Sequence, residues 1–322
     1  SHAGPGHRAA AAVAGRHLAY HLRSGRSRAR CLPGTTTGQR PARPATEHPM
    51  CGITGIFDTR HRRDIDRGVL QRMNDSQLHR GPDEGSVHVE PGLGLGHRRL
   101  SIIDIATGQQ PLANEDGSVV VVFNGEIYNY QPLMAELQAA GHRFRTKSDT
   151  ECIVHGWEQW GEDCVKRFRG MFAFALWDRN RQTLFLARDR LGVKPMHYAL
   201  LDDGTLLFGS ELKSLLAYRG GQGGQGGLRR DLDPLAVEEY FALGYTAEPR
   251  TIFKQAQKLP PAHTLSIRRG QPLPEPREYW DVHFTGGNPS TLADACAELR
   301  QRLDESVRLR MIAEVPLGAF LS

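Results

Sequence analysis

The stretch "MCGITGIF" (residues 50–57) places a cysteine between a methionine and a glycine, directly before an apolar run that predicts a strand. A small residue after methionine permits removal of an initiator methionine, which would leave Cys51 with a free α-amine. Such an amine has a pKa of about 8 and can serve as the base for its own thiol. The alternative is a buried structural cysteine, the ordinary role of an isolated cysteine.

The residues on either side of this stretch differ sharply in charge. Residues 1–49 contain eight arginines and one acid, Glu47, and carry +7, whereas the other 273 residues carry −2. We therefore expect residues 1–49 to be a disordered leader upstream of the true start, with an arginine-rich transit peptide as the alternative. The remaining chain has no basic bias toward nucleic acid and no apolar run of the ~18 residues that a membrane span needs.

The five cysteines are scattered along the chain, and none forms a CxxC pair or a zinc-spaced cluster with histidine. This pattern predicts no metal site and is typical of a reducing compartment, so we expect a cytoplasmic protein. The cysteines are Cys31, Cys51, Cys152, Cys164 and Cys296.

From Met50 onward the sequence alternates between strand and helix patterns. "SVVVVF" (118–123) predicts a buried strand that ends in a turn at Asn124-Gly125. Amphipathic helices are expected at 130–141, 150–160, 211–218, 232–245 and 292–312, and further strands at 52–57, 93–104, 171–178, 183–189, 196–201 and 205–210. The glycine-rich "GGQGGQGG" (220–227) predicts a linker. It suggests one domain at 51–215, a linker at 216–230 and the beginning of a second domain at 231–322.

Two further groups of residues suggest chemistry. The Asn124 amide and the Gly125 N–H could converge on one oxygen as an oxyanion hole, although Asn-Gly is more often a hairpin turn. Arg99 and Asp149 could hold the α-carboxylate and α-ammonium of a free amino acid. Their alternatives are solvated surface charges and, for Asp149 or Thr150, the N-cap of a helix.

Eight motifs in order resemble the class II glutamine amidotransferase domain of glutamine-hydrolysing asparagine synthetases. They are "MCGITGIF", "HRGPDEG", "GHRRLSIID", "FNGEIYNY", "SDTE", "GMFAFALWD", "ARDRLGVKPMHY" and "FGSELKSLL", and the resemblance extends over residues 51–322. "NEDGSVVVVFNGEIYNY" and "DRNRQTLFLARDR" are most similar to the branch associated with exosortase (PEP-CTERM) loci.

The resemblance implies an α/β fold, a four-layer α/β/β/α N-terminal-nucleophile sandwich at 51–215. The start of an α/β synthetase domain would follow at 231–322. It implies that Cys51 is the nucleophile and that Asn124 and Gly125 form the oxyanion hole. The residues implied for glutamine binding are Arg99, Leu100, Ser101, Ile102, Ile103, Asn124, Gly125, Glu126 and Asp149. Leu321 and Ser322 match the first residues of the family's ATP-binding loop.

The activity implied is glutamine-dependent asparagine synthesis from aspartate, with ATP and Mg²⁺ as co-substrate and no cofactor for the glutaminase step. The partners would be glutamine, aspartate and ATP, with a homodimer as the assembly, and neither nucleic acid nor membrane. One alternative keeps the glutaminase step but passes ammonia to another carboxylate in exopolysaccharide or cell-envelope synthesis. The other alternative is a non-catalytic binding module. We also expect the chain to be a fragment that ends where the ATP loop begins.

Overall fold

The computed structural model describes residues 50–101, 104, 107–220, 226–284, 287, 291–315 and 318. Residues 1–49 and four of the expected site residues lie outside this set, namely Ile102, Ile103, Leu321 and Ser322.

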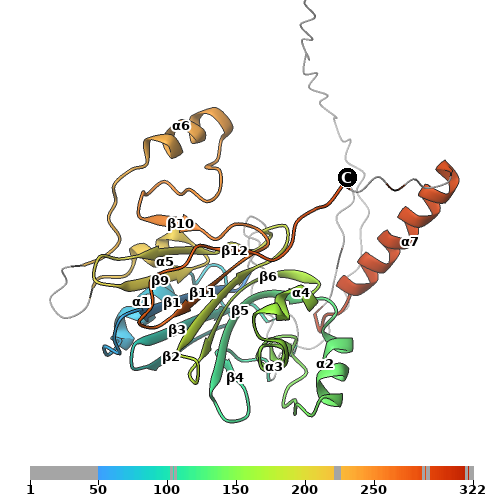
Figure 1. The fold of residues 1–322 in the computed structure, drawn as a ribbon, viewed down its shortest axis with the longest axis horizontal. Helices are drawn as coiled ribbons and strands as arrows, with labels where there is room; N and C mark the ends of the chain where they lie inside the picture. Colours follow the sequence, from blue (N-terminus) through green and yellow to red (C-terminus); the bar gives the residue numbers. More distant parts are fainter. Residues whose placement is uncertain are drawn as a thin grey trace, which may run out of the picture. The chain divides into compact units, whose positions relative to one another are not determined.

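Two six-stranded antiparallel sheets form the centre of the described unit (Figure 1). In the first sheet the order is β10 (Ala256–Lys258), β8 (His197–Leu200), β9 (Thr205–Gly209), β1 (Gly52–Asp58), β3 (Leu93–Arg99) and β2 (Glu84–Glu90). In the second it is β12 (Arg277–Glu278), β11 (His263–Arg268), β7 (Thr183–Arg188), β6 (Gly170–Asp178), β5 (Val119–Ile127) and β4 (Leu112–Ala113).

Helices cover the outer face of each sheet. One apolar cluster joins the first sheet to α1 (Arg67–Asp75) and α5 (Leu212–Leu216) through residues such as Ile56, Leu70 and Leu215. A second joins the other sheet to α2 (Tyr130–Ala139), α3 (Glu151–Trp160) and α4 (Cys164–Arg167), which follows the 3₁₀ turn Gly161–Asp163. A third lies between the two sheets. The predicted α/β/β/α order of layers is confirmed.

The two-residue period of the strands assigns each side chain to one of these cores. In β5, Val119, Val121 and Phe123 face the helices, whereas Val120 and Val122 face the other sheet. In β1 and β3, the residues that face between the sheets are Ile53, Phe57, Leu93 and Leu95. Continued by two-residue steps, this face contains Cys51, Arg99 and Asn124. The strand pattern therefore directs these three residues into the space between the sheets.

The boundary expected at residues 215–230 differs from the structure. Strands β10, β11 and β12, at residues 256–278, complete the same two sheets, and Leu259, Leu265 and Ile267 are buried between them. The chain returns because β7 and β8 would otherwise expose unpaired edges. Glycine-rich composition indicated a connection correctly but carried no information on where the following segment packs.

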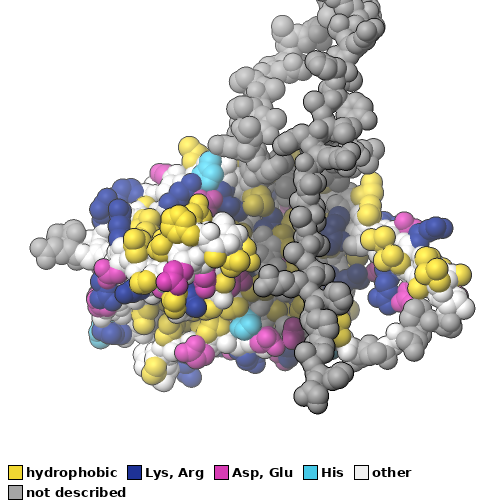
Figure 2. All heavy atoms as spheres, turned by 90° about the horizontal axis from the view of Figure 1, so that it is seen from above, with side chains coloured by type: hydrophobic (Ala, Val, Ile, Leu, Met, Phe, Trp, Pro, Cys, Tyr) yellow, Lys and Arg dark blue, Asp and Glu magenta, His cyan; other side chains and the backbone are white. Residues whose placement is uncertain are grey.

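Two helices leave most of their apolar side chains exposed. In α6 (Pro234–Leu243) Phe241 is 83% exposed, and in α7 (Leu292–Arg310) Leu292 is 82% exposed. Figure 2 shows hydrophobic side chains gathered over both segments. Within the part of the chain that the structure describes, no helix combines the length and the apolar character needed to span a membrane.

Candidate active site

A cavity of about 290 Å³ unites most of the predicted site residues. Cys51, Arg99, Leu100, Asn124, Gly125, Glu126 and Asp149 all line it. Ser101 does not; its backbone N–H donates to Asp83 Oδ2 at 3.1 Å, beside the cavity wall. The cavity is at the small end of ligand pockets, roughly 300 Å³, and suits a molecule the size of a free amino acid.

Cys51 lies immediately before β1 and is held on both sides. The Leu100 backbone N–H donates to Cys51 Sγ at 3.4 Å, and the thiol lies 3.6 Å from the Leu100 carbonyl oxygen. The Arg80 guanidinium donates to the Cys51 carbonyl oxygen at 3.0 Å and also pairs with Glu211 at 3.1 Å. These contacts position the sulfur while leaving it in the cavity wall.

Opposing effects act on the pKa of the Cys51 thiol. Burial raises the pKa, whereas the Leu100 hydrogen bond and the charges of Lys194 and Arg99 lower it. The net result is a pKa above the usual range, so the thiol needs a base or a further positive charge to become a nucleophile.

Asn124 and Gly125 lie within β5, not in the turn that the sequence predicted. They pair with Ala173 and Phe172 of β6, and the strand continues to Ile127. A side chain at Gly125 would collide with the backbone of Met171 and Phe172, so only glycine fits. Tertiary pairing has overridden the turn preference of Asn-Gly. Among the described residues, no group accepts a hydrogen bond from the buried Asn124 Nδ2, which belongs to the cavity wall.

Asp149 is buried and is not the helix cap. Thr150 occupies the N-cap position of α3, and Asp149 Oδ2 instead accepts a hydrogen bond from the Ile127 N–H at 2.8 Å. Burial raises the pKa of Asp149 to about 7; the Ile127 hydrogen bond opposes this shift and the nearby Glu126 carboxylate adds to it. The carboxyl group therefore gains its charge close to neutral pH.

Arg99 is also buried and lines the same cavity. Its guanidinium donates to the Asp104 carbonyl oxygen at 2.6 Å and to Glu84 Oε2 at 3.3 Å. Glu126 also faces the cavity, and burial raises the pKa of its carboxyl group while Lys194 lowers it. The cavity thus combines one guanidinium and two carboxyl groups, the complement that an amino-acid zwitterion requires.

Sequence reasoning missed Lys194, which is 5% exposed and lines the cavity. Its Nζ lies 3.1 Å from Met50 Sδ, and its backbone N–H donates to Asp189 Oδ2 at 2.9 Å. The motif "ARDRLGVKPMHY" contained it, but a single lysine in a loop has no spacing that indicates a pocket. The other lining residues outside the prediction are Met50, Gly108, Gln110, Phe123, Ser148, Thr150, Met171 and Val193.

Comparisons with known proteins identify the family of this chain. The model of the glutamine amidotransferase domain matches residues 50–280. The chain is 37% identical over 277 residues to glutamine-hydrolysing asparagine synthetase 3 of Bacillus subtilis, covering 85% of this chain and 43% of that protein. It is 34% identical over 301 residues to amidase chyE of Penicillium rubens, covering 91% and 39%. The chain therefore spans less than half the length of these relatives.

The solved structures are more distant. Glutamine phosphoribosylpyrophosphate amidotransferase from B. subtilis matches with a TM-score of 0.48 and 19% identity, covering 71% of this chain and 49% of that one.

The position of Lys194 predicts an electrostatic effect on Cys51. Replacing Lys194→Met keeps the length of the side chain but removes the charge, so the pKa of the Cys51 thiol should rise further. Alkylation of Cys51 by iodoacetamide, followed by peptide mass spectrometry across pH 6–10, should shift to higher pH. The exposed Lys213→Met is the matched control and should leave the profile unchanged. Identical profiles for Lys194→Met and the unchanged chain would contradict the assigned effect.

Proposed function

Since the chain belongs to the glutamine amidotransferase family, we propose that its cavity binds free glutamine and that Cys51 hydrolyses the side-chain amide to glutamate and ammonia. The observation that carries this proposal is that Cys51 and Asn124 line the same cavity, and that Asn124 Nδ2 has no hydrogen-bond partner among the described residues. A buried donor without an acceptor costs about 1–3 kcal/mol, so its retention favours a role in binding a ligand oxygen.

The proposed reaction begins with the free α-amine of Cys51 after cleavage of the Met50–Cys51 bond. The amine takes the thiol proton, and Sγ attacks the amide carbon of glutamine. The carbonyl oxygen becomes an anion between Asn124 and Gly125, where Asn124 Nδ2 donates to it. The amine returns the proton to the departing nitrogen, so ammonia leaves and a glutamyl thioester remains. Water, deprotonated by the same amine, then cleaves the thioester and releases glutamate.

The α-groups of glutamine would occupy the opposite part of the cavity. In this proposal Arg99 binds the α-carboxylate, and Asp149 with Glu126 binds the α-ammonium. Leu100 lines the cavity, and we propose from the family resemblance that Ser101, Ile102 and Ile103 extend its backbone wall; Ile102 and Ile103 lie outside the described residues. The approach of an ammonium ion would hold Asp149 in its charged form, which makes binding and ionisation mutually supportive.

For the whole protein, we propose that the ammonia amidates an ATP-activated aspartate to give asparagine, with Mg²⁺ accompanying ATP. The similarity to glutamine-hydrolysing asparagine synthetase 3 supports this. Leu321 and Ser322, expected at ATP, lie outside the described residues. A different carboxylate acceptor is the second candidate, favoured by the similarity to amidase chyE and by the two exosortase-branch motifs.

The four described cysteines are free thiols, which supports a cytoplasmic protein. A homodimer is proposed as the assembly.

Asn124→Ala should lower kcat by ~10²–10³ with little change in KM, because an oxyanion donor acts mainly in the transition state. Its melting temperature should hardly change, since Nδ2 has no partner among the described residues. Asn114→Ala is the matched control: Asn114 is also buried but bonds Ser118, Val119 and Glu158, so it should lose stability and keep kcat. A change in KM alone would make Asn124 a binding residue instead.

Asp149 predicts a pH dependence of glutamine binding. Its pKa of about 7 means that the carboxyl group is neutral below that pH, so KM should rise as the pH falls through 7. Asp149→Asn keeps the acceptor for the Ile127 N–H but removes the charge. It should raise KM by an amount that corresponds to ~2–5 kcal/mol of binding free energy, and KM should no longer depend on pH near 7. The control ligand is the deaminated analogue of glutamine, whose binding should not change. Unaltered preference for glutamine in Asp149→Asn would reduce Asp149 to an anchor for Ile127.

The self-base mechanism predicts that activity requires Cys51 at the amino terminus. A chain started at Met50 and processed to Cys51 should release glutamate, whereas one that retains residues 1–50 should not. The intact mass reports the state of each terminus, and Cys51→Ala sets the background. Equal rates from the two chains would rule out the α-amine as base, and no glutamate from either would favour a binding module.

A further inference from the structure

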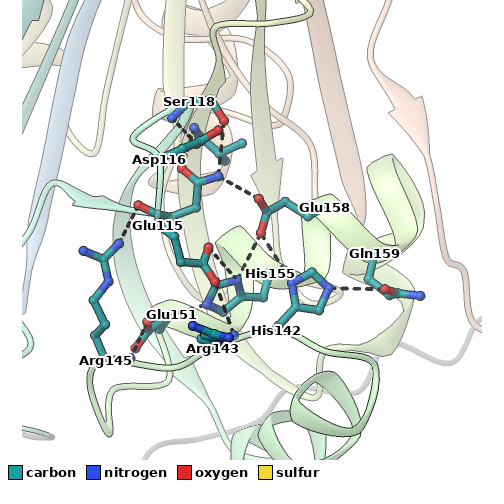
Figure 3. A network of polar contacts seen from close by, with 12 residues as sticks. Glu115, Asp116, Ser118, His142, Arg143, Arg145, Glu151, His155, Glu158 and Gln159 are labelled. Atoms are coloured by element: carbon teal, nitrogen blue, oxygen red, sulfur yellow. Dashed lines mark hydrogen bonds and ion pairs between the residues drawn. The ribbon is translucent and has the colours of Figure 1, made fainter.

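A cluster of histidine and glutamate side chains lies around α3, outside the residues of the catalytic cavity. His155 and Glu158 belong to α3, His142 follows α2, and Glu115 comes from the turn between β4 and β5 (Figure 3). One potential ligand atom from each of His142, His155 and Glu158 lies within 4.8 Å of the other two. His155 is fully buried, His142 is partly buried and Glu158 is exposed, so the cluster extends from the core to the surface.

The two imidazoles present the same nitrogen to one carboxylate oxygen. His155 Nδ1 lies 3.0 Å from Glu158 Oε2, and His142 Nδ1 lies 3.5 Å from the same atom. Glu115 Oε2 lies 3.9 Å from His155 Nδ1. Donor atoms of a tetrahedral zinc ion with bonds of ~2.0–2.1 Å lie about 3.3 Å apart, so these spacings are close to those of a ligand set.

One of the opposite ring nitrogens has an acceptor of its own. His142 Nε2 lies 3.2 Å from Gln159 Oε1, which favours the tautomer that carries its proton there and leaves the Nδ1 lone pair for a metal. His155 Nε2 lies 3.5 Å from Glu151 Oε1 but forms no hydrogen bond among the described residues. Glu151 is itself held by N–H groups of Arg145 and Thr146 at 2.8 and 2.7 Å.

The charges also favour a cation. Glu115, Glu151 and Glu158 surround two imidazoles. The Arg143 backbone N–H donates to Glu115 Oε1 at 3.2 Å, and the Arg145 guanidinium donates to the Asn114 carbonyl oxygen at 2.6 Å. The cluster therefore needs positive charge, which either protons or one divalent ion can supply.

We propose that His142 Nδ1, His155 Nδ1 and Glu158 Oε2 bind one Zn²⁺ ion, with the Glu115 carboxylate as the fourth ligand. Two imidazoles and carboxylates select zinc and similar first-row ions over Mg²⁺ or Ca²⁺. The site is structural, because four protein ligands leave no open position. It would tie the segment after α2 and the β4–β5 turn to α3, whose first turn follows Asp149 and Thr150 of the cavity.

The test is zinc binding by the untagged full chain after chelator treatment. Titration calorimetry at pH 7.5 should give one site that is lost in His142→Ala and in Glu158→Gln, and zinc at a hundredfold excess over Kd should raise Tm by roughly 5–10 °C. His88→Ala is the matched control, because His88 of β2 pairs with Glu90 at 3.5 Å and not with a residue of the cluster, so this variant should retain the site.

Cobalt substitution gives a second readout. Co²⁺ should show the intense visible bands of tetrahedral coordination without thiolate-to-cobalt charge transfer, since no cysteine belongs to the site. No zinc binding by the unchanged chain, or binding that His142→Ala and Glu158→Gln leave intact, would overturn the proposal. His142 is only partly buried, with 16% of its side chain exposed, so His142→Ala should still fold, as circular dichroism would verify.

Discussion

Strand β5 has no side that faces solvent: its odd-numbered residues pack against helices and its even-numbered residues pack against the opposite sheet. A shift of one residue would exchange the two sets, and every apolar contact of the strand opposes such a shift. The same alternation carries Asn124 into the space that also receives Cys51 from β1 and Arg99 from β3. Across this space the His97 Nε2–H donates to the Phe123 carbonyl oxygen at 3.0 Å, and burial lowers the pKa of His97 to about 3, which keeps the ring neutral. The geometry of the cavity is thus a continuation of core packing.

The sequence was most informative where local patterns coincide with tertiary structure. The valine run of β5 and the helices α2, α3, α5, α6 and α7 were predicted from periodicity, and the cavity residues Cys51, Arg99, Leu100, Asn124, Gly125, Glu126 and Asp149 were predicted from motifs and the family resemblance. Of the features that escaped, three depend on a distant partner. Pairing with β6 keeps Asn124-Gly125 extended, unpaired edges of β7 and β8 recruit residues 256–268, and folding of a loop brings Lys194 to Met50. No window of neighbouring residues contains those partners.

The cavity has groups of both charge signs, and the carboxyl group of Asp149 among them has a pKa near neutral pH. One charge comes from the Arg99 guanidinium, whereas burial raises the pKa of Asp149 to about 7. An empty cavity therefore avoids the cost of a permanent buried anion, and a cationic group on the ligand restores that charge when it arrives. Recognition of the two α-groups of an amino acid would then differ in kind: the α-carboxylate meets a preformed guanidinium, and the α-ammonium induces the charge of its own partner.

The peptide bond between Met50 and Cys51 blocks the α-amine of Cys51, and it also holds the Met50 side chain at the cavity. The sulfur of this side chain accepts a hydrogen bond from Lys194. On the proposed mechanism, a chain that still carries Met50 lacks the free α-amine that acts as the base. Its cavity is also partly filled by the Met50 side chain. Such an inhibitor is covalently attached, so dilution cannot remove it, and hydrolysis removes it once and for all. Each molecule would become active at a single moment in its life, set by a processing enzyme instead of by a reversible equilibrium.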